Sequence, residues 1–156
     1  MIRRIEPSDV DRAVALVHEL ALYEKAPDEC HLTAEQLHEV LFRENPALFA
    51  HVAEQDGEVV GVALWFLNFS TWDGVHGIYL EDLFVRPEHR GDGLGTALLA
   101  ALARECVANG YSRLQWSVLN WNEPSIAFYR KLGAEPLDEW TVFRLAGDAL
   151  TALGGR

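Results

Sequence analysis

One short segment constrains the fold more than any other: a glycine-rich loop that joins an apolar strand to a helix. The pattern predicts a strand over residues 78–85, a break at Arg86-Pro87 and a helix over 94–109, opened by the loop Arg90-Gly91-Asp92-Gly93-Leu94-Gly95-Thr96. Glycine accepts a positive φ and lets a ligand approach the backbone closely. A helix start offers unpaired N–H groups and the positive end of the helix dipole, both of which favour an anion. The loop therefore predicts a cradle for a pyrophosphate, with the Arg90 side chain as a further donor.

The spacing of the glycines separates this loop from other phosphate-binding loops. Gly91, Gly93 and Gly95 do not follow the G-x-G-x-x-G pattern of dinucleotide-binding loops, and the chain has no GK[ST] segment. The loop also follows the fourth predicted strand of the chain rather than the first strand of a βαβ repeat. NAD and ATP are therefore disfavoured as ligands. The alternative, that the glycines only form a tight turn between strand and helix, stays open at this point.

Hydrophobic periodicity and turn signals predict a mixed α/β fold, with helices on both faces of a mixed sheet. Ser8 with Asp11, and Thr33 with Gln36, have the spacing of a capping box at a helix start. Asp56-Gly57 is a two-residue hairpin signal. The element order is β-α-α-β-β-β-α-β-α-β within one domain, residues 1–156. The predicted strands are 2–5, 48–54, 58–69, 78–85, 114–119 and 140–145; two helices follow Ser8 and Thr33, and two more cover 94–109 and 124–132.

Composition limits the partners. The chain has 13 Lys and Arg against 24 Asp and Glu, a net charge of −11, so a nucleic acid is not an expected partner while small cations are attracted. The longest apolar run, residues 59–67, is far shorter than a membrane span, and no targeting segment is expected. Cys30 and Cys106 stand apart, which favours reduced thiols in a cytoplasmic protein. The histidines lack the spacing of a metal site, so no metal is expected.

Longer segments of the chain carry a family resemblance. Residues 90–95 match the R/Q-x-x-G-x-G/A loop of the GNAT superfamily of N-acetyltransferases, and the predicted element order is similar to that family's order over nearly the whole chain. More narrowly, the chain resembles the diamine (spermidine/spermine) and thialysine acetyltransferases. The segments that carry this narrower resemblance are 19–24 (ELALYE), 79–85 (YLEDLFV) and 121–129 (WNEPSIAFY).

The resemblance implies the GNAT acyl-CoA N-acyltransferase fold and acetyl-CoA as co-substrate. In the family, the strand before the loop pairs with the pantetheine arm and the loop holds the pyrophosphate. The implied cofactor-binding residues are Leu83, Phe84 and Val85 on the strand, Arg90, Gly91, Asp92, Gly93, Leu94, Gly95 and Thr96 on the loop, and Asn122, Pro124 and Ser125 further along. Taken from the sequence alone, the last three are also a plain start of a helix.

The resemblance also assigns chemistry to particular side chains. Tyr129 matches the tyrosine that protonates the departing CoA thiolate, and Glu81 matches the carboxylate that contacts the amine and accepts a proton through water. Tyr23 and Glu24 match the substrate-side pair of the subgroup, with Glu139 a weaker candidate. Strand alternation predicts that Glu81 and Asp82 point to opposite faces, which would leave Asp82 outside the site.

The expected activity is acetyl transfer to the primary amine of a small cationic acceptor, such as a polyamine, a diamine or a thialysine-like basic amino acid, within a ternary complex. The expected assembly is a homodimer. Two alternatives stay open: the same fold acting on another amine (an amino acid, an aminoglycoside or a protein N-terminus), and a non-catalytic acyl-CoA sensor. The segment between Gly133 and Trp140 is shorter than in the polyamine enzymes, which leaves the acceptor undecided.

Overall fold

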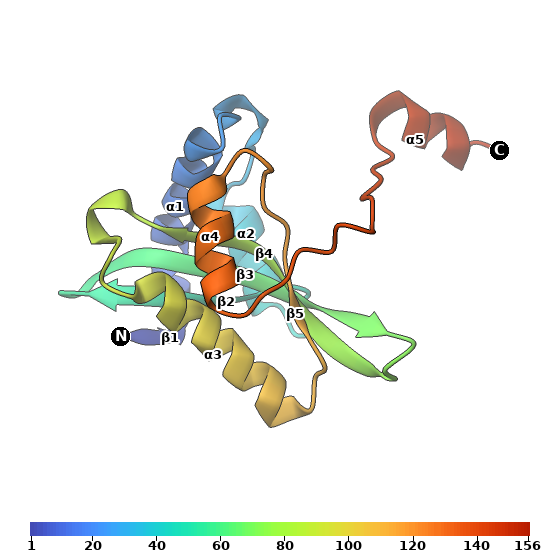
Figure 1. Cartoon of the computed structure of the whole chain (residues 1–156). Helices are drawn as coiled ribbons and strands as arrows, with labels where there is room; N and C mark the ends of the chain where they lie inside the picture. The colour runs from blue at the N-terminus through green and yellow to red at the C-terminus, as the bar shows by residue number, and fades with distance from the viewer. The chain divides into compact units, whose positions relative to one another are not determined.

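The structure, a computed structural model, describes residues 1–156, which form two compact units, Met1–Ser117 and Val118–Arg156. The first unit holds a five-stranded sheet in the order β1-β2-β3-β4-β5 (Figure 1). Neighbouring strands are antiparallel except β4 and β5, which run parallel. The predicted mixed α/β class is confirmed. The strands are β1 (Ile2–Arg4), β2 (Phe49–Gln55), β3 (Glu58–Ser70), β4 (Val75–Val85) and β5 (Leu114–Gln115).

Three helices cover the sheet: α1 (Val10–Tyr23), α2 (Ala34–Phe42) and α3 (Leu94–Asn109). Figure 1 shows α1 and α2 behind the sheet and α3 in front of it. On the α1 and α2 side, a cluster of buried apolar residues joins Leu16 and Leu37 to Val62 and Phe84 of the strands. On the other side, α3 packs against β2, β3 and β4 and buries its own apolar stripe. The sheet is thus held between two helical layers that fix the ends of β4 and α3.

Several local predictions are confirmed. Asp56 and Gly57 have φ of 53° and 78°, the left-handed pair that a tight two-residue hairpin requires. Thr33 caps α2, since its hydroxyl accepts the Gln36 N–H and the Gln36 side chain accepts the Thr33 N–H. Helix α3 has the predicted bounds, and Gly110 follows it with φ of 70°.

The first helix begins differently from the prediction. The capping box lies at Glu6 and Asp9, not at Ser8 and Asp11, because Pro7–Asp9 forms a short 3₁₀ turn before α1. The Asp9 carboxylate accepts the Glu6 N–H at 2.8 Å and two donors of the Arg3 guanidinium. Pro7 suits the first turn because its missing N–H would have no partner there.

The prediction was wrong for the last strand. Residues 140–145 form no strand, and an unpredicted helix, α5 (Gly147–Gly154), follows them. The second unit otherwise contains α4 (Glu123–Lys131), close to the predicted 124–132. Strand β5 covers only Leu114–Gln115 of the predicted 114–119. A segment with strand-like alternation becomes a strand only where a neighbouring backbone pairs with it, which the pattern itself does not supply.

Candidate functional site

Strand β4 loses its regular pairing on both sides shortly before the glycine loop. A bulge interrupts its register with β3, because Leu64 pairs with Asp82 and Trp65 with Leu80, which leaves Glu81 without a counterpart. On the other side, β5 pairs only with Ile78 and Tyr79. The edge of β4 from Leu80 to Val85 therefore has no strand partner and is open to a ligand that pairs with the backbone.

Alternation along β4 decides which backbone groups face this open edge. The Arg86 N–H donates to Val60 O of β3 at 3.0 Å. Backbone groups of an antiparallel strand alternate between its two neighbours, so Phe84 also faces β3, while Leu83 and Val85 face the open edge. Of the three predicted strand residues, Leu83 and Val85 thus offer their backbone, and Phe84 contributes a buried side chain to the core.

The glycine loop has the geometry of an anion cradle. Gly91 and Gly93 have φ of 94° and 78°, and a Cβ at either position would meet no atom within 4 Å. Gly93 is the N-cap of α3 and has no side chain to cap it, so the N–H groups of Leu94, Gly95 and Thr96 have no side-chain acceptor. These donors and the helix dipole point to the same place, as predicted for a pyrophosphate.

Side chains around the loop hold it in position. Arg86, where the loop begins, makes an ion pair with Glu19 of α1 at 2.6 Å and lies 3.5 Å from Glu58. Gln55, at the end of β2, bonds His89 Nδ1 at 3.0 Å and donates to Asp92 Oδ2 at 3.5 Å. The Asp92 carboxylate is therefore held toward Gln55.

Arg90 lies at the junction of the loop and the end of α1. Its Nε donates to Val85 O at 2.8 Å, and its guanidinium carbon lies 5.0 Å from the centre of the Tyr23 ring and 5.4 Å from that of Phe84. The expectation that Arg90 simply adds a donor to the cradle is incomplete, because the side chain packs on two aromatic rings and holds one carbonyl of the open edge.

Three carboxyl groups gather beside the bulge: Glu24, which ends α1, and Glu81 and Asp82 of β4. Burial, and after it the charges of Glu81 and Glu24, together raise the pKa of Asp82 from 3.8 to about 6. Burial also raises the pKa of Glu24. The bulge interrupts the strand alternation from which opposite faces were predicted for Glu81 and Asp82; Glu81 is exposed, Asp82 is partly buried, and the Glu81 charge still acts on Asp82. No signal in the residue types marks a bulge, so the sequence did not point to Asp82 as a candidate.

The remaining candidates lie in the second unit. Asn122 is the N-cap of α4, where its Oδ1 accepts the Ser125 N–H at 3.4 Å and Pro124 occupies the first turn. The plain helix-start interpretation of these three residues is therefore confirmed, and their cofactor role stays a prediction. Tyr129 lies on α4 with its ring 5.4 Å from that of Phe128. Glu139 is exposed.

Comparison with known proteins identifies the family. Residues 14–134 match the model of the acetyltransferase (GNAT) family. The chain belongs to this family. It is 37% identical to the thialysine N-epsilon-acetyltransferase of Bos taurus over 167 residues, which cover 100% of this chain and 98% of that protein. It is 30% identical to the spermidine/spermine N(1)-acetyltransferase-like protein 1 of Homo sapiens, over 96% of this chain and 23% of that protein.

A solved structure agrees with this assignment. The V. cholerae integron cassette protein VCH_CASS6 has a TM-score of 0.84 to this chain at 26% identity, covering 100% of this chain and 98% of that one. As a GNAT member with full-length acetyltransferase relatives, the chain is an acetyl-transferring enzyme, and its family uses acetyl-CoA as co-substrate. The uncapped start of α3 and the open edge of β4 fit two parts of that co-substrate, its pyrophosphate and its amide-bearing arm.

Proposed function

We propose that this protein transfers the acetyl group of acetyl-CoA directly to a primary amine of a small cationic acceptor, a polyamine, a diamine or a thialysine-like basic amino acid. The observation that carries the proposal is the group of three carboxyl side chains, Glu24, Glu81 and Asp82, beside the open edge of β4. Such a group favours a cation, and a strand edge ending in an anion cradle suits acetyl-CoA.

The co-substrate would bind along elements of the first unit. Its pyrophosphate would accept hydrogen bonds from the N–H groups at the start of α3. The amides of its pantetheine arm would form backbone hydrogen bonds with Leu83 and, in part, with Val85. Arg90 already donates to Val85 O, so a ligand would compete with Arg90 for that carbonyl. This pairing would place the thioester near the bulge, where the carboxyl groups lie.

The acceptor has to lose a proton before it reacts, because an alkylammonium has a pKa of ~10 in water. We assign the proton acceptor to Asp82, whose pKa of about 6 makes it ionised at neutral pH and more basic than an ordinary aspartate. Glu24 and Glu81 would hold the cation. Glu81 stays a second candidate for the base through a water molecule, as the family resemblance implies.

The transfer itself forms one bond and breaks another. The neutral amine nitrogen attacks the thioester carbon and gives up one of its two protons to water, the C–S bond breaks, and the CoA sulfur leaves as a thiolate. We propose Tyr129 as the acid that gives this thiolate its proton, in keeping with its place in the 121–129 segment. Replacing Tyr129 by Phe keeps the ring and removes the hydroxyl, so kcat should fall by ~10²–10⁴ while acetyl-CoA affinity stays nearly unchanged. Weaker acetyl-CoA binding at unchanged kcat would show a packing role instead.

A CoA-release assay against a panel of amines tests the acceptor class. The panel holds spermidine, thialysine and ornithine, each compared with a neutral-tailed amine of similar length. At low salt kcat/KM should be higher for the charged acceptors, and the difference should shrink without vanishing as salt rises, because surface attraction is screened and contact with half-buried carboxylates is screened less. Equal kcat/KM for charged and neutral tails would contradict the acceptor class and leave acetyl transfer in place.

The same panel separates the alternatives. An enzyme for another amine would release CoA with an amino acid, an aminoglycoside or an N-terminal peptide and not with the polyamines. A sensor would bind acetyl-CoA and release no CoA with any amine. We also propose that both units belong to one catalytic domain, since the family match at 14–134 includes residues of each.

We further propose a cytoplasmic homodimer. Apolar side chains of residues 140–145, among them Val142 and Phe143 with exposed fractions of 87% and 91%, are left without cover in the single chain, which supports a second copy as their partner. Both cysteines are free thiols. No helix combines the length and the apolar character needed to cross a bilayer. Sedimentation of the wild type and of Phe143→Ser tests the assembly, with a monomeric wild type as the contradicting result.

A further inference from the structure

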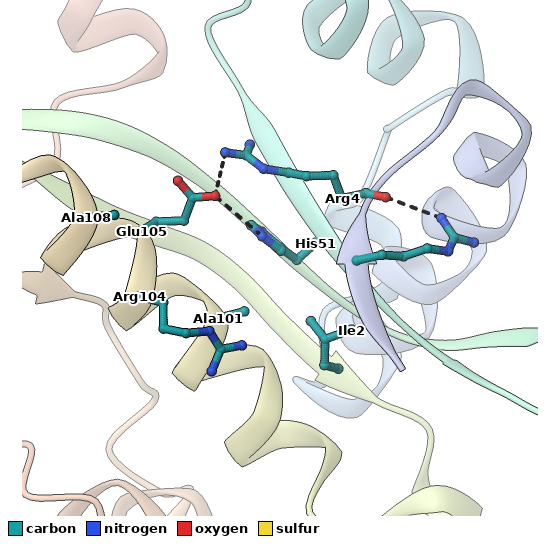
Figure 2. Close-up of a pocket in the computed structure, with 8 residues that line it drawn as sticks. Ile2, Arg4, His51, Ala101, Arg104, Glu105 and Ala108 are labelled. Carbon is teal, nitrogen blue, oxygen red and sulfur yellow. Dashed lines mark hydrogen bonds and ion pairs between the residues drawn. The ribbon is translucent and has the colours of Figure 1, made fainter.

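A recess lies on the α3 side of the sheet, away from the glycine loop. It has a volume of about 330 Å³ and is lined by β1, the start of β2 and the second half of α3 (Figure 2). Its helical side chains begin at Ala101, and Arg104 follows Gly93 by eleven residues, which is roughly 16 Å along a helix. The lining residues are Ile2, Arg3, Arg4, His51, Ala101, Arg104, Glu105 and Ala108.

The guanidinium groups of this recess differ in how they are neutralised. Arg3 is held by Asp9 at 2.7 Å and by Glu54 at 2.8 Å. Arg4 makes one ion pair, with Glu105 Oε1 at 2.7 Å, and its guanidinium lies 4.9 Å from the centre of a Trp65 ring. The third guanidinium, that of Arg104, lies on α3 next to Glu105 and differs from both.

Arg104 has neither an ion pair nor a hydrogen bond, although it lines the same recess. Figure 2 shows Glu105 reaching both Arg4 and His51, while Arg104 extends on the Ile2 side of the recess. The His51 ring is neutral here, because its Nδ1 accepts the Trp65 N–H at 3.1 Å and its Nε2 lies 3.8 Å from Glu105 Oε1. The three arginines of the recess are balanced by Asp9, Glu54 and Glu105 in total, but these carboxylates pair with Arg3 and Arg4 and leave Arg104 without a counter-ion.

An arginine without a counter-ion is notable in a chain whose net charge is −11. A guanidinium binds a carboxylate or a phosphate through two parallel N–H donors, and Arg104 has all its donors available. Ile2, Ala101 and Ala108 give the recess a short apolar wall beside the charge. A ligand that fits has an oxyanion head and a small aliphatic body.

We propose that this recess is a binding site for a small organic oxyanion, a carboxylate or a phosphate, held by Arg104 with Arg4 beside it and separate from the acetyl-CoA site. The Glu105 carboxylate competes with the ligand for Arg4 and so limits the affinity. The site follows from the charges and the recess of the first unit alone, and it stands whether or not the proposed acceptor class is correct.

Isothermal titration of the full chain at low ionic strength, with succinate in one arm and inorganic phosphate in the other, tests the site. At least one of them should bind, and the arm that binds assigns the head group. The titration is repeated with saturating acetyl-CoA, and the affinity should be unchanged, because the two sites are distinct. Absence of binding in both arms, or loss of binding with acetyl-CoA present, would overturn the proposal.

Three variants give the proposal a signed test. Arg104→Gln should weaken binding at least about tenfold, since it removes a charge-assisted pair of hydrogen bonds. Glu105→Gln should tighten binding several-fold, because it frees Arg4 and removes the competing charge. Arg43→Gln, which removes an equal charge from the exposed C-terminal end of α2, should leave binding unchanged. Equal affinities for Arg104→Gln and Arg43→Gln, or no tightening with Glu105→Gln, would contradict the site; circular dichroism confirms that each variant is folded.

Discussion

The Arg90 guanidinium lies 5.0 Å from the centre of the Tyr23 ring, and so the glycine loop is joined to the end of α1 by a cation–π contact. The two side chains were predicted for different roles, Arg90 in the co-substrate loop and Tyr23 beside the acceptor. Their contact gives the loop a second point of attachment beyond the ion pair of Arg86 with Glu19.

A double-mutant cycle measures this contact. In urea unfolding of the protein without ligand, Tyr23→Leu and Arg90→Met should each lower the free energy of unfolding, and the two effects should couple by about 0.5–1 kcal/mol, as for a cation–π pair at an exposed site. If the effects of the single variants add up to that of the double variant, the two side chains do not interact in solution.

Gly93→Val tests the anion cradle. The added side chain should fill the space in front of the first turn of α3 and abolish the rise in Tm that acetyl-CoA gives the wild type, because a ligand stabilises only the state that binds it. Gly57→Val is a matched control, since Gly57 has the same φ of 78° and equally open surroundings but lies in the β2–β3 hairpin. Gly57→Val should be destabilised by the same backbone strain as Gly93→Val, but its Tm should still rise when acetyl-CoA is added. Equal shifts in both variants would contradict the cradle.

Asp82→Asn should change activity and stability in opposite directions. If Asp82 is the base, kcat/KM of the wild type should rise with pH through about 6 as Asp82 ionises. The Asp82→Asn variant should lack this rise, and its rate should be ~10²–10⁴-fold lower. The folded pKa lies above the unfolded value, so the stability from this group is present at low pH and is lost as pH rises through about 6. Asparagine is neutral at every pH and so keeps this stability. The free energy of unfolding of Asp82→Asn at pH 7 should therefore exceed that of the wild type by on the order of 1–3 kcal/mol.

Glu81→Gln is the comparison for Asp82→Asn. If Asp82 is the base, Glu81→Gln should raise KM for a charged acceptor and keep the pH limb near 6. If instead Glu81→Gln removes the limb and Asp82→Asn keeps it, the base is Glu81 and the assignment of Asp82 is wrong.

His51 should make the fold sensitive to acid. Burial lowers its pKa from 6.5 to about 4, with the positive charges of Arg4 and Arg104 acting in the same direction. Between these two values the unfolded chain binds a proton at His51 that the folded chain does not. The free energy of unfolding should therefore fall as pH decreases across this window, by roughly 3 kcal/mol in all. Urea unfolding at pH 7, 6 and 5 should show a flatter pH dependence for His51→Gln; an equal slope would mean that another group controls it.

Features that depend on neighbours in the sequence could be predicted well. The bounds of α3, the Asp56-Gly57 hairpin and the Thr33 cap follow from residues within a few positions of one another, and each is confirmed. The glycine loop belongs to the same class, because its backbone conformation and the uncapped helix start are local. These features, with the family resemblance they carry, led from the sequence to an acetyl-CoA-dependent enzyme.

The carboxyl cluster could not be predicted in the same way. Whether Glu81 and Asp82 share a site depends on the register of β4 against β3, and a single unpaired residue in that register overrides the alternation that the sequence suggests. The raised pKa of Asp82 depends further on burial and on the charge of Glu24, which is distant in sequence.

The sequence by itself determined the glycine loop, the element order up to α4 and the excess of acidic residues, because these rest on residue types and short spacings. The tertiary structure alone decided that burial and the charges of Glu81 and Glu24 raise the pKa of Asp82, that Arg90 packs on Tyr23, that residues 140–145 form no strand, and that Arg104 has no partner in its recess. The physical reason is the same in each case: strand pairing, burial and charge neutralisation are set by segments far apart in the chain, and no local pattern records which segments meet.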